Sequence, residues 1–460
     1  MDTIAFFSSI VGSIITLGVA YISLRGTLLD ISHLKENAWP LLWYLSIFLV
    51  IIPLVIVSAV GIDNIPVFFV AWSGLEQPVT LITIATLVCY LVTLGFFLRL
   101  LGLVYKRYYL HLLLPNERKL NSLALSLCLF GLSLLVSFSL FGYKHAFLYS
   151  LVEGTSVLKV RLANKYTTYI PSQIQSLLPL VGYALSIVSG YLSRYNGKRS
   201  VLFLLIAVII LSAPGDKAFP VKGIILWILG NGKWLPKRIF SGRMIIFIVS
   251  MCVVGFGGGY LTLSRQVPGL SFNAFAVYLL NRFGVGQMAG MYETFALFYQ
   301  NYLPEGNYFW HIIPGARFLV DYIDYHKMLM MITEGVSYTE MGVKNTYFLA
   351  EAWAIGGPVL GFVSPIIVGF SYALGLYLTI NLMRVFFGKG VAFHLGLPIY
   401  LLTHDITGGF SVFPLLKGVF LLAPQLIAIR LFYFLLSIIG GVMRDLFRFR
   451  GFVPGKGNTK

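Results

Sequence analysis

The sequence predicts an all-α protein that crosses a membrane many times, and three observations indicate this fold class. Of its 460 residues, 58% are hydrophobic and only 11% are charged, whereas about one quarter of a soluble domain is charged. The apolar residues form runs of about the 20 residues that a helix needs to cross a bilayer. Lysine and arginine cluster in short segments between these runs. We therefore expect a polytopic α-helical membrane protein.

The apolar runs mark the expected transmembrane helices. Three runs are short; two of them flank Pro214-Gly215-Asp216-Lys217, and Lys222 interrupts the second of these two. Short runs interrupted by glycine or proline occur in polytopic proteins that bring backbone to membrane depth beside a cavity. Together with the longer runs they predict about 11 spans. The longer runs are 4–24, 41–61, 79–104, 122–142, 174–193, 243–263, 354–382 and 418–441, and the shorter ones are 201–213, 218–230 and 391–404.

Positive charge orients these helices, because cytoplasmic loops carry an excess of lysine and arginine. One threading places nearly all basic clusters inside, with the N-terminus outside and the C-terminus in the cytoplasm. It makes 201–230 a re-entrant-like hairpin whose apex, Pro214-Gly215-Asp216-Lys217, faces outward. The segment 143–173 is external in this threading and yet basic, which suggests a functional role for its charges.

The threading divides the chain into four parts. Segments 271–302 and 316–333 have helical periodicity, so we expect helices that cover the outer face of the membrane body. The four parts are membrane helices in 1–263, a large aromatic external loop in 264–353, C-terminal membrane helices in 354–441 and a basic cytoplasmic tail in 442–460.

Three external arginines and one lysine are candidates for binding a phosphate-containing substrate. Arg161, Arg265 and Arg282 lie near membrane boundaries, and guanidinium groups bind pyrophosphate through paired hydrogen bonds. Lys217, at the hairpin apex, would reach a phosphate at the membrane surface. The alternatives are that the arginines contact ordinary phospholipid headgroups and that Lys217 pairs with Asp216.

His311 and Glu351 are candidates for moving a proton. A neutral histidine in the external loop would take a proton from a sugar hydroxyl, and a partly buried carboxylate at the start of the span 354–382 is a second candidate base. The alternatives are an interfacial histidine that hydrogen-bonds its own loop and a carboxylate placed by the helix dipole.

Other polar residues of the C-terminal half receive a structural interpretation. Arg317, Asp321 and Asp324 have the spacing of one helix face and predict a salt-bridge ladder. His404-Asp405 is interpreted as a boundary turn, with a proton site as the alternative.

Missing motifs exclude several classes of protein. The sequence has no Walker A motif, no GxGxxG after a strand and no HExxH, so we expect neither a nucleotide-driven pump nor a metal or other cofactor. The net charge of +17 is distributed between apolar runs, so it does not indicate nucleic-acid binding. No internal repeat argues for a secondary transporter.

The layout resembles the bacterial oligosaccharide repeat-unit polymerases, often called Wzy, a family whose architecture the O-antigen ligases share. The resemblance rests on the dominant loop 264–353, the smaller basic loop 143–173 and the hairpin apex. The run from Asn345 to Glu351, followed by Gly356-Gly357, is similar to the family's return into the membrane.

The resemblance implies a C-type glycosyltransferase-like enzyme of the bacterial inner membrane that acts on the periplasmic side. It would polymerise repeat units carried on undecaprenyl pyrophosphate, without metal or nucleotide, and a chain-length regulator protein would be a partner beside membrane lipid. Arg161, Arg265 and Arg282 are the positions that fit the family's loop arginines, although none is followed by glycine at the spacing that some members have. A ligase and, from another class, a polysaccharide flippase or exporter are the alternatives.

Overall fold

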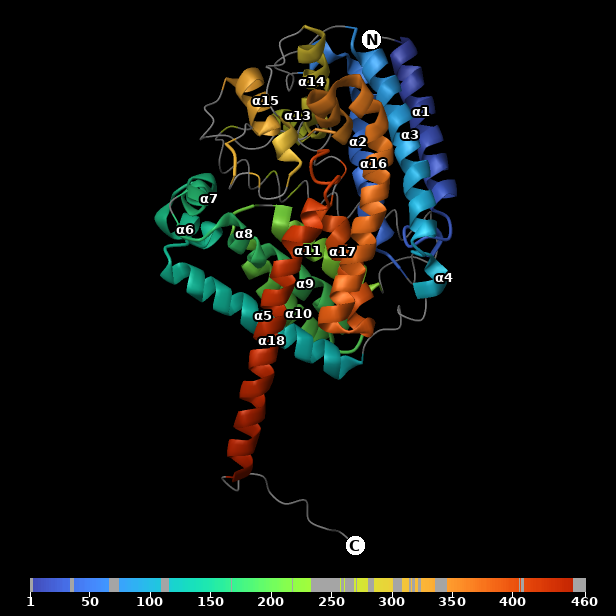
Figure 1. Ribbon diagram of the computed structural model, residues 1–460. Helices are drawn as coiled ribbons and strands as arrows, with labels where there is room; N and C mark the ends of the chain where they lie inside the picture. Colours follow the sequence, from blue (N-terminus) through green and yellow to red (C-terminus); the bar gives the residue numbers. More distant parts are fainter. Residues whose placement is uncertain are drawn as a thin grey trace. The chain divides into compact units, whose positions relative to one another are not determined.

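The computed structural model describes most of the chain as helices (Figure 1). No strand occurs among the described residues; the pairing of Thr27 with Val104 is an isolated bridge. The structure describes residues 3–33, 37–65, 74–108, 116–166, 168–216, 218–232, 257, 260, 269, 271–279, 285–300, 308–313, 316, 319–321, 324–335, 346–404, 406 and 409–449.

Six helices of this described part are long and apolar enough to cross a membrane, so an all-α protein with membrane-length helices is confirmed. The total of about 11 spans and the side on which each loop lies stay predictions, and the expected span 243–263 falls almost entirely outside the described residues. The six are α1 (Thr3–Leu24), α2 (Pro40–Val60), α3 (Glu76–Leu100), α5 (Glu117–Leu140), α16 (Phe348–Phe387) and the stretch Lys417–Leu436 of α18 (Lys417–Phe449).

The chain forms two compact units. The first comprises residues 1–112, 235–380 and 396–420, and the second comprises 113–234, 381–395 and 421–460. Besides the helices named above, the structure contains α4 (Tyr105–Tyr108), α6 (Ala146–Glu153), α7 (Val157–Tyr166), α8 (Ser172–Gln175), α9 (Leu177–Leu192), α10 (Gly197–Ser212), α11 (Ala218–Asn231), α13 (Phe272–Leu279), α14 (Ala289–Tyr299), α15 (Tyr325–Glu334) and α17 (Lys389–Thr403), with short 3-10 turns η1 (Ile31–His33), η2 (Ile62–Asn64), η5 (Val285–Gln287) and η6 (Tyr308–His311).

In the first unit, α1 and α3 run side by side (Figure 1). Gly95 permits this close approach, because a Cβ atom there would overlap the carbonyl of Ser23. Aromatic residues then connect α2 and α3 to α16: the Trp43 indole N–H donates to the Tyr90 hydroxyl at 3.4 Å, and the Tyr90 ring lies against Phe348. This buried aromatic contact fixes the first turn of α16.

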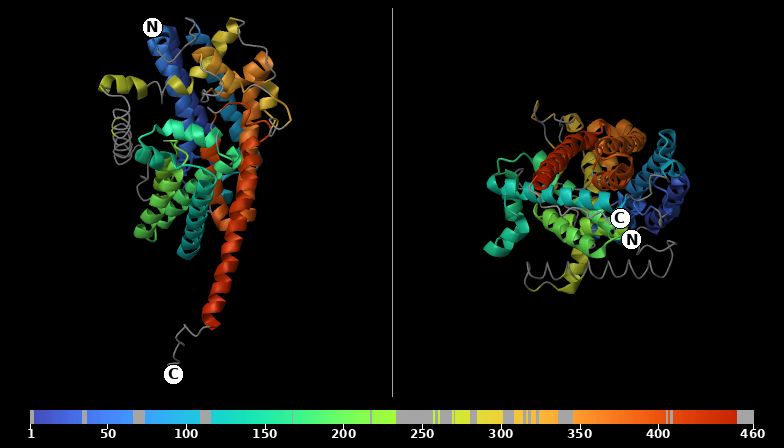
Figure 2. Two further views of the ribbon diagram at one scale, coloured as in Figure 1. Left: turned by 90° about the vertical axis from the view of Figure 1, so that its left-hand side faces the viewer. Right: turned by 90° about the horizontal axis from the view of Figure 1, so that it is seen from below.

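In the second unit, α9 is buried along its whole length and packs against α5, α10 and α11 (Figures 1 and 2). The hydroxyls of Ser189 and Ser200 each donate to the other residue's carbonyl, at 2.8 and 2.7 Å, which ties α9 to α10. The helices α10 and α11 follow one another through the turn that contains Asp216 and also pack together.

The helix α16 changes direction at Gly356 and Gly357, whose backbone angles are not helical. Gly357 has a φ of +64°, a conformation that suits glycine because it has no Cβ. Pro358 follows directly. The first turns of α16, with Glu351, therefore form a separate short helix at the head of the long apolar one.

Candidate functional site

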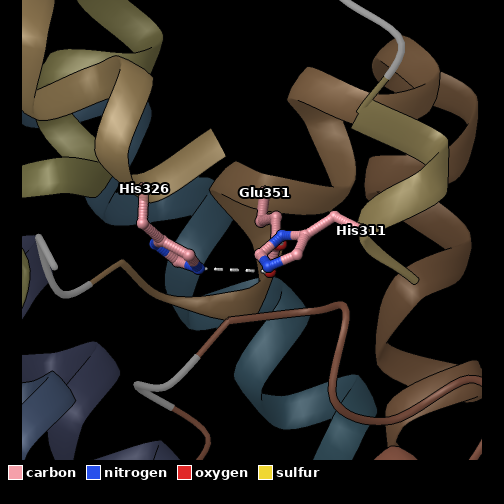
Figure 3. A group of neighbouring side chains, drawn as sticks. All are labelled: His311, His326 and Glu351. Carbon is pink, nitrogen blue, oxygen red and sulfur yellow. Dashed lines mark hydrogen bonds and ion pairs between the residues drawn. The ribbon is translucent and has the colours of Figure 1, made fainter. Parts of the chain in front are cut away.

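Three buried side chains meet in the first unit: His311 from η6, His326 from α15 and Glu351 from the start of α16 (Figure 3). Glu351 is completely buried, and the two histidines are only 8% and 5% exposed. One ligand-type atom from each lies within 4.8 Å of the others. We call these three residues the His-Glu cluster. Two of its members, His311 and Glu351, are the residues that the sequence proposed for proton transfer.

The Glu351 carboxylate is contacted from three sides. His311 Nδ1 lies 3.0 Å from Oε1, and His326 Nε2 lies 3.7 Å from Oε2. The backbone N–H of Ser411 donates to Oε2 at 3.0 Å. These groups suit the ionised carboxylate, because a buried charge needs donors or opposite charges around it.

His311 is positioned through both its ring and its backbone. Its Nε2 lies 3.8 Å from a carboxylate oxygen of Asp324, while its Nδ1 faces Glu351. Its carbonyl accepts a hydrogen bond of 3.1 Å from the Lys417 ammonium group. The imidazole thus lies between two carboxylates, which hold the orientation of the ring.

Asp324 also positions His326. It caps the N-terminus of α15, where its Oδ1 accepts from the backbone N–H of His326 at 3.1 Å. This cap satisfies a backbone donor that the helix itself leaves unpaired. His326 Nδ1 lies 3.4 Å from the Thr346 hydroxyl, so its Nε2 points to Glu351.

An apolar cluster anchors α15 beneath these polar groups. It includes Tyr308, Tyr325 and Met328, and the Tyr308 hydroxyl donates to the Met328 sulfur at 3.4 Å. The Tyr325 hydroxyl pairs with Thr294. Burial raises the pKa of Tyr308 to about 12 and raises the pKa of Tyr325 as well. Both phenols therefore stay protonated at neutral pH.

Gly409 lies against the cluster with a φ of +106°. A Cβ atom at this position would overlap Glu351 Oε2 and His326 Nε2. The residue therefore has to be glycine for two reasons, its backbone conformation and the space that the cluster needs.

The cluster contains the side chains of proton-transfer sites and also those that bind transition metals. A histidine held by a carboxylate is the common arrangement of a general base. Two imidazole nitrogens and one carboxylate oxygen also form the ligand set of catalytic zinc sites. Both chemistries require burial and fixed ring orientations, which the contacts described above provide.

Of the four residues expected to bind phosphate, only Arg161 lies among the described residues. Arg161 lies on α7 in the second unit, where its guanidinium is 3.5 Å from Asp216 and 51% of its side chain is exposed. Lys217, Arg265 and Arg282 lie outside the described residues. Asp216 pairs with Arg161, and the alternative pairing of Asp216 with Lys217 stays a prediction.

The predicted salt-bridge ladder on 316–333 is wrong, because the helix α15 begins only at Tyr325. Asp321 precedes the helix and is exposed, Asp324 is its cap, and Arg317 lies outside the described residues. Sequence reasoning also missed His326. The spacing Asp324-Tyr325-His326 after a loop is the signal that could have found both residues, since aspartate is a preferred N-cap.

His404 is buried at the end of α17, with its ring stacked on Tyr400 at a centroid distance of 4.1 Å. Its Nδ1 lies 3.2 Å from the carbonyl of Tyr400. These contacts agree with the structural interpretation of His404, while Asp405 lies outside the described residues.

The described residues form an all-helical chain that has six helices of membrane-spanning length and a buried polar centre, the His-Glu cluster. Comparison with models of protein families, with curated proteins and with solved structures finds no match. The function must therefore be argued from the residues of the site.

Proposed function

We propose that the chain is a glycan polymerase of the bacterial inner membrane. It joins oligosaccharide repeat units carried on undecaprenyl pyrophosphate, as in an O-antigen or a related surface polysaccharide, on the periplasmic side. One observation carries this proposal: His311 and Glu351, which are 40 positions apart, are in contact at 3.0 Å in a buried cluster. A glycosyl transfer to a sugar hydroxyl needs a general base that accepts the proton of that hydroxyl.

The reaction has one bond made and one broken. The hydroxyl oxygen of the acceptor attacks the anomeric carbon of the donor, and the bond from that carbon to the pyrophosphate oxygen breaks. The hydroxyl proton passes to His311 or Glu351, and undecaprenyl pyrophosphate leaves with the electron pair. The donor's glycosyl–pyrophosphate bond supplies the energy, so no nucleotide is consumed.

In this proposal, Arg161, Arg265, Arg282 and Lys217 bind the pyrophosphate, whose negative charge grows as the bond breaks. Arg161 has a side chain that is 51% exposed and forms an ion pair of 3.5 Å with Asp216. A guanidinium in that state can exchange a single carboxylate for a diphosphate, which accepts more hydrogen bonds from it. The aromatic residues of 264–353 would stack on sugar rings and exclude water.

The same proposal includes the topology and the partners. The C-terminus lies in the cytoplasm, the segment 264–353 lies in the periplasm, and membrane lipid surrounds the apolar helices. A protein that regulates chain length is the expected protein partner. No nucleic acid is involved.

The test is the surface glycan of a deletion strain that carries the wild-type gene or a variant. We expect single repeat units on the outer lipid in the deletion strain and a ladder of long chains with the wild-type gene. Glu351→Gln and His311→Gln should give single units at normal protein levels. Long chains with both variants would contradict the proposal.

The two alternative functions give different products. A ligase deletion would leave the outer lipid without any glycan while polymer accumulates on the lipid carrier. A flippase deletion would leave single lipid-linked units on the cytoplasmic side. Either result would replace the polymerase assignment.

A further inference from the structure

We infer that the His-Glu cluster is a binding site for a divalent transition metal, with Zn²⁺ as the best fit. The ligands are His311 Nδ1, His326 Nε2 and a carboxylate oxygen of Glu351. The metal site is argued from these residues alone, whereas its role in catalysis rests on the proposed function. It departs from the metal-independent reaction expected from the sequence.

The distances in the cluster fit a tetrahedral ion. Ligand atoms that lie about 2.0–2.1 Å from a tetrahedral zinc ion are about 3.3 Å from one another. Here the two imidazole nitrogens lie 3.0 and 3.7 Å from the carboxylate oxygens that they face. These are two different oxygens of Glu351, and one ligand atom from each residue lies within 4.8 Å of the others, so shifts of up to about 1.5 Å bring three ligand atoms to the spacing of a zinc ion.

The charges of the cluster also favour a cation. Glu351 and Asp324 place two carboxylates, fully and nearly fully buried, around the two imidazoles. The centroids of the two imidazole rings are 5.8 Å apart, so one ion between them can contact a nitrogen of each. A divalent ion there supplies positive charge that compensates for the buried carboxylates.

The outer contacts of both histidines are those of metal ligands. A metal-bound histidine usually directs its second nitrogen to a carboxylate or another polar group, which fixes the ring. His311 directs its Nε2 to Asp324, and His326 directs its Nδ1 to Thr346. The Asp324 cap of α15 connects these contacts, because it fixes the backbone of His326 as well.

Three protein ligands leave a fourth position for an exogenous oxygen, as in catalytic zinc sites. Gly409 packs against Glu351 Oε2 and His326 Nε2, where a side chain would overlap both atoms. In the proposed transfer, a cation held by His311, His326 and Glu351 would lower the pKa of an acceptor hydroxyl at that fourth position. The hydroxyl proton would then pass to the Glu351 oxygen that does not bind the metal, because His311 would be a ligand.

The experiment is elemental analysis of the full-length protein, purified in detergent with an affinity tag that contains no histidine. We expect about one zinc ion per chain in the wild type. In His326→Gln and Glu351→Gln the content should fall to about one tenth or less, since even outer contacts cost 10–100-fold in affinity. Cobalt added to the metal-free wild type should give visible d–d absorption, which both variants should lack.

His404→Gln is the matched control, because His404 is another buried histidine of the same compact unit. It should bind as much zinc as the wild type. A single symmetrical peak in size-exclusion chromatography must accompany each variant. If His326→Gln or Glu351→Gln fails to fold, the cobalt absorption of the other variant is compared with that of the wild type.

Two results would overturn the metal site: no metal in the wild type even after incubation with Zn²⁺, or equal zinc contents in wild type and ligand variants. The failure of the proposed function is distinguishable. Wild-type zinc binding that the variants lose, together with unchanged long glycan chains in all of them, would retain the metal site and refute the polymerase. A wild-type protein that binds no metal but extends chains only when His311 and Glu351 are present would refute the metal site and support the polymerase.

Discussion

The two polar regions that the sequence singled out differ sharply in the structure. The His-Glu cluster consists of residues that are at most 8% exposed and are held by Asp324, Thr346 and the Ser411 backbone. The pair of Arg161 and Asp216 is a single contact of 3.5 Å, with half of the arginine side chain exposed. The first region is a buried site whose side chains are fixed by several partners, whereas the second is a surface ion pair.

The two regions differ in how much their structure depends on the partners of each charged group. Burying charged groups costs several kcal/mol unless each has partners, so the cluster persists only because helices from distant parts of the sequence supply them. An exposed ion pair contributes about 0–1 kcal/mol, so Arg161 remains available for a stronger anionic partner. Four substitutions test the comparison, beginning with the largest expected effect.

Glu351→Gln should have the largest effect. It keeps the shape of the side chain but removes the charge that both histidines face. Loss of a proton-transfer group lowers rates by about 10²–10⁴-fold, which an assay of chain extension with lipid-linked repeat units would measure. Glu153→Gln, at an exposed position on α6, is the control and should be fully active.

Gly409→Ala should have the second-largest effect. The new methyl group would overlap Glu351 and His326, and φ is +106°. We expect loss of activity and a loss of stability of more than about 1 kcal/mol. Gly335→Ala is the matched control, since Gly335 also has a positive φ but nothing within 4 Å of the added atom. Equal losses of activity and stability in both variants would show that backbone strain, and not overlap with the cluster, causes the effect.

Asp324→Asn should have an intermediate effect. Asparagine caps a helix about as well as aspartate, so stability should change little while His311 loses its charged partner. We expect activity to fall by about 10–100-fold, as for other outer-shell contacts. Asp324→Ala should in addition lose about 1 kcal/mol of stability. Wild-type activity in Asp324→Asn would contradict the claim that His311 needs the charge of Asp324.

Asp216→Asn should have the smallest effect. Removing one partner of an exposed pair changes the free energy of unfolding by about 0–1 kcal/mol, which unfolding in mixed detergent micelles would measure. Arg161→Ala should be equally stable but should weaken donor binding, seen as a raised KM. A loss of several kcal/mol in either variant would show that the pair is structural.

The helical architecture was largely predictable from the sequence, because hydrophobic runs of membrane length are a direct physical requirement. The runs 4–24 and 41–61 correspond closely to α1 and α2. The helix α16 begins six residues before the expected 354, where Phe348 is buried with its ring against Tyr90 and Tyr347 is buried against Phe348. Such tertiary contacts have no periodic signal in the sequence.

The site was predictable only in part. His311 and Glu351 were identified by residue type and by their places in the loop and at a helix start. Their contact depends on how η6, α15 and α16 pack, which no local spacing encodes. His326 was missed because the helix was expected to begin at 316, so that Asp324 was interpreted as one of a row of surface charges and not as the cap.

The most direct test of the central claim, that the His-Glu cluster performs the chemistry, is chain extension by purified protein. Wild type and Glu351→Gln would be compared in detergent with synthetic undecaprenyl-pyrophosphate-linked repeat units, and the products separated by length. We predict a ladder of products with the wild type and only the starting unit with the folded variant. A ladder of the same length and rate from Glu351→Gln would contradict the claim.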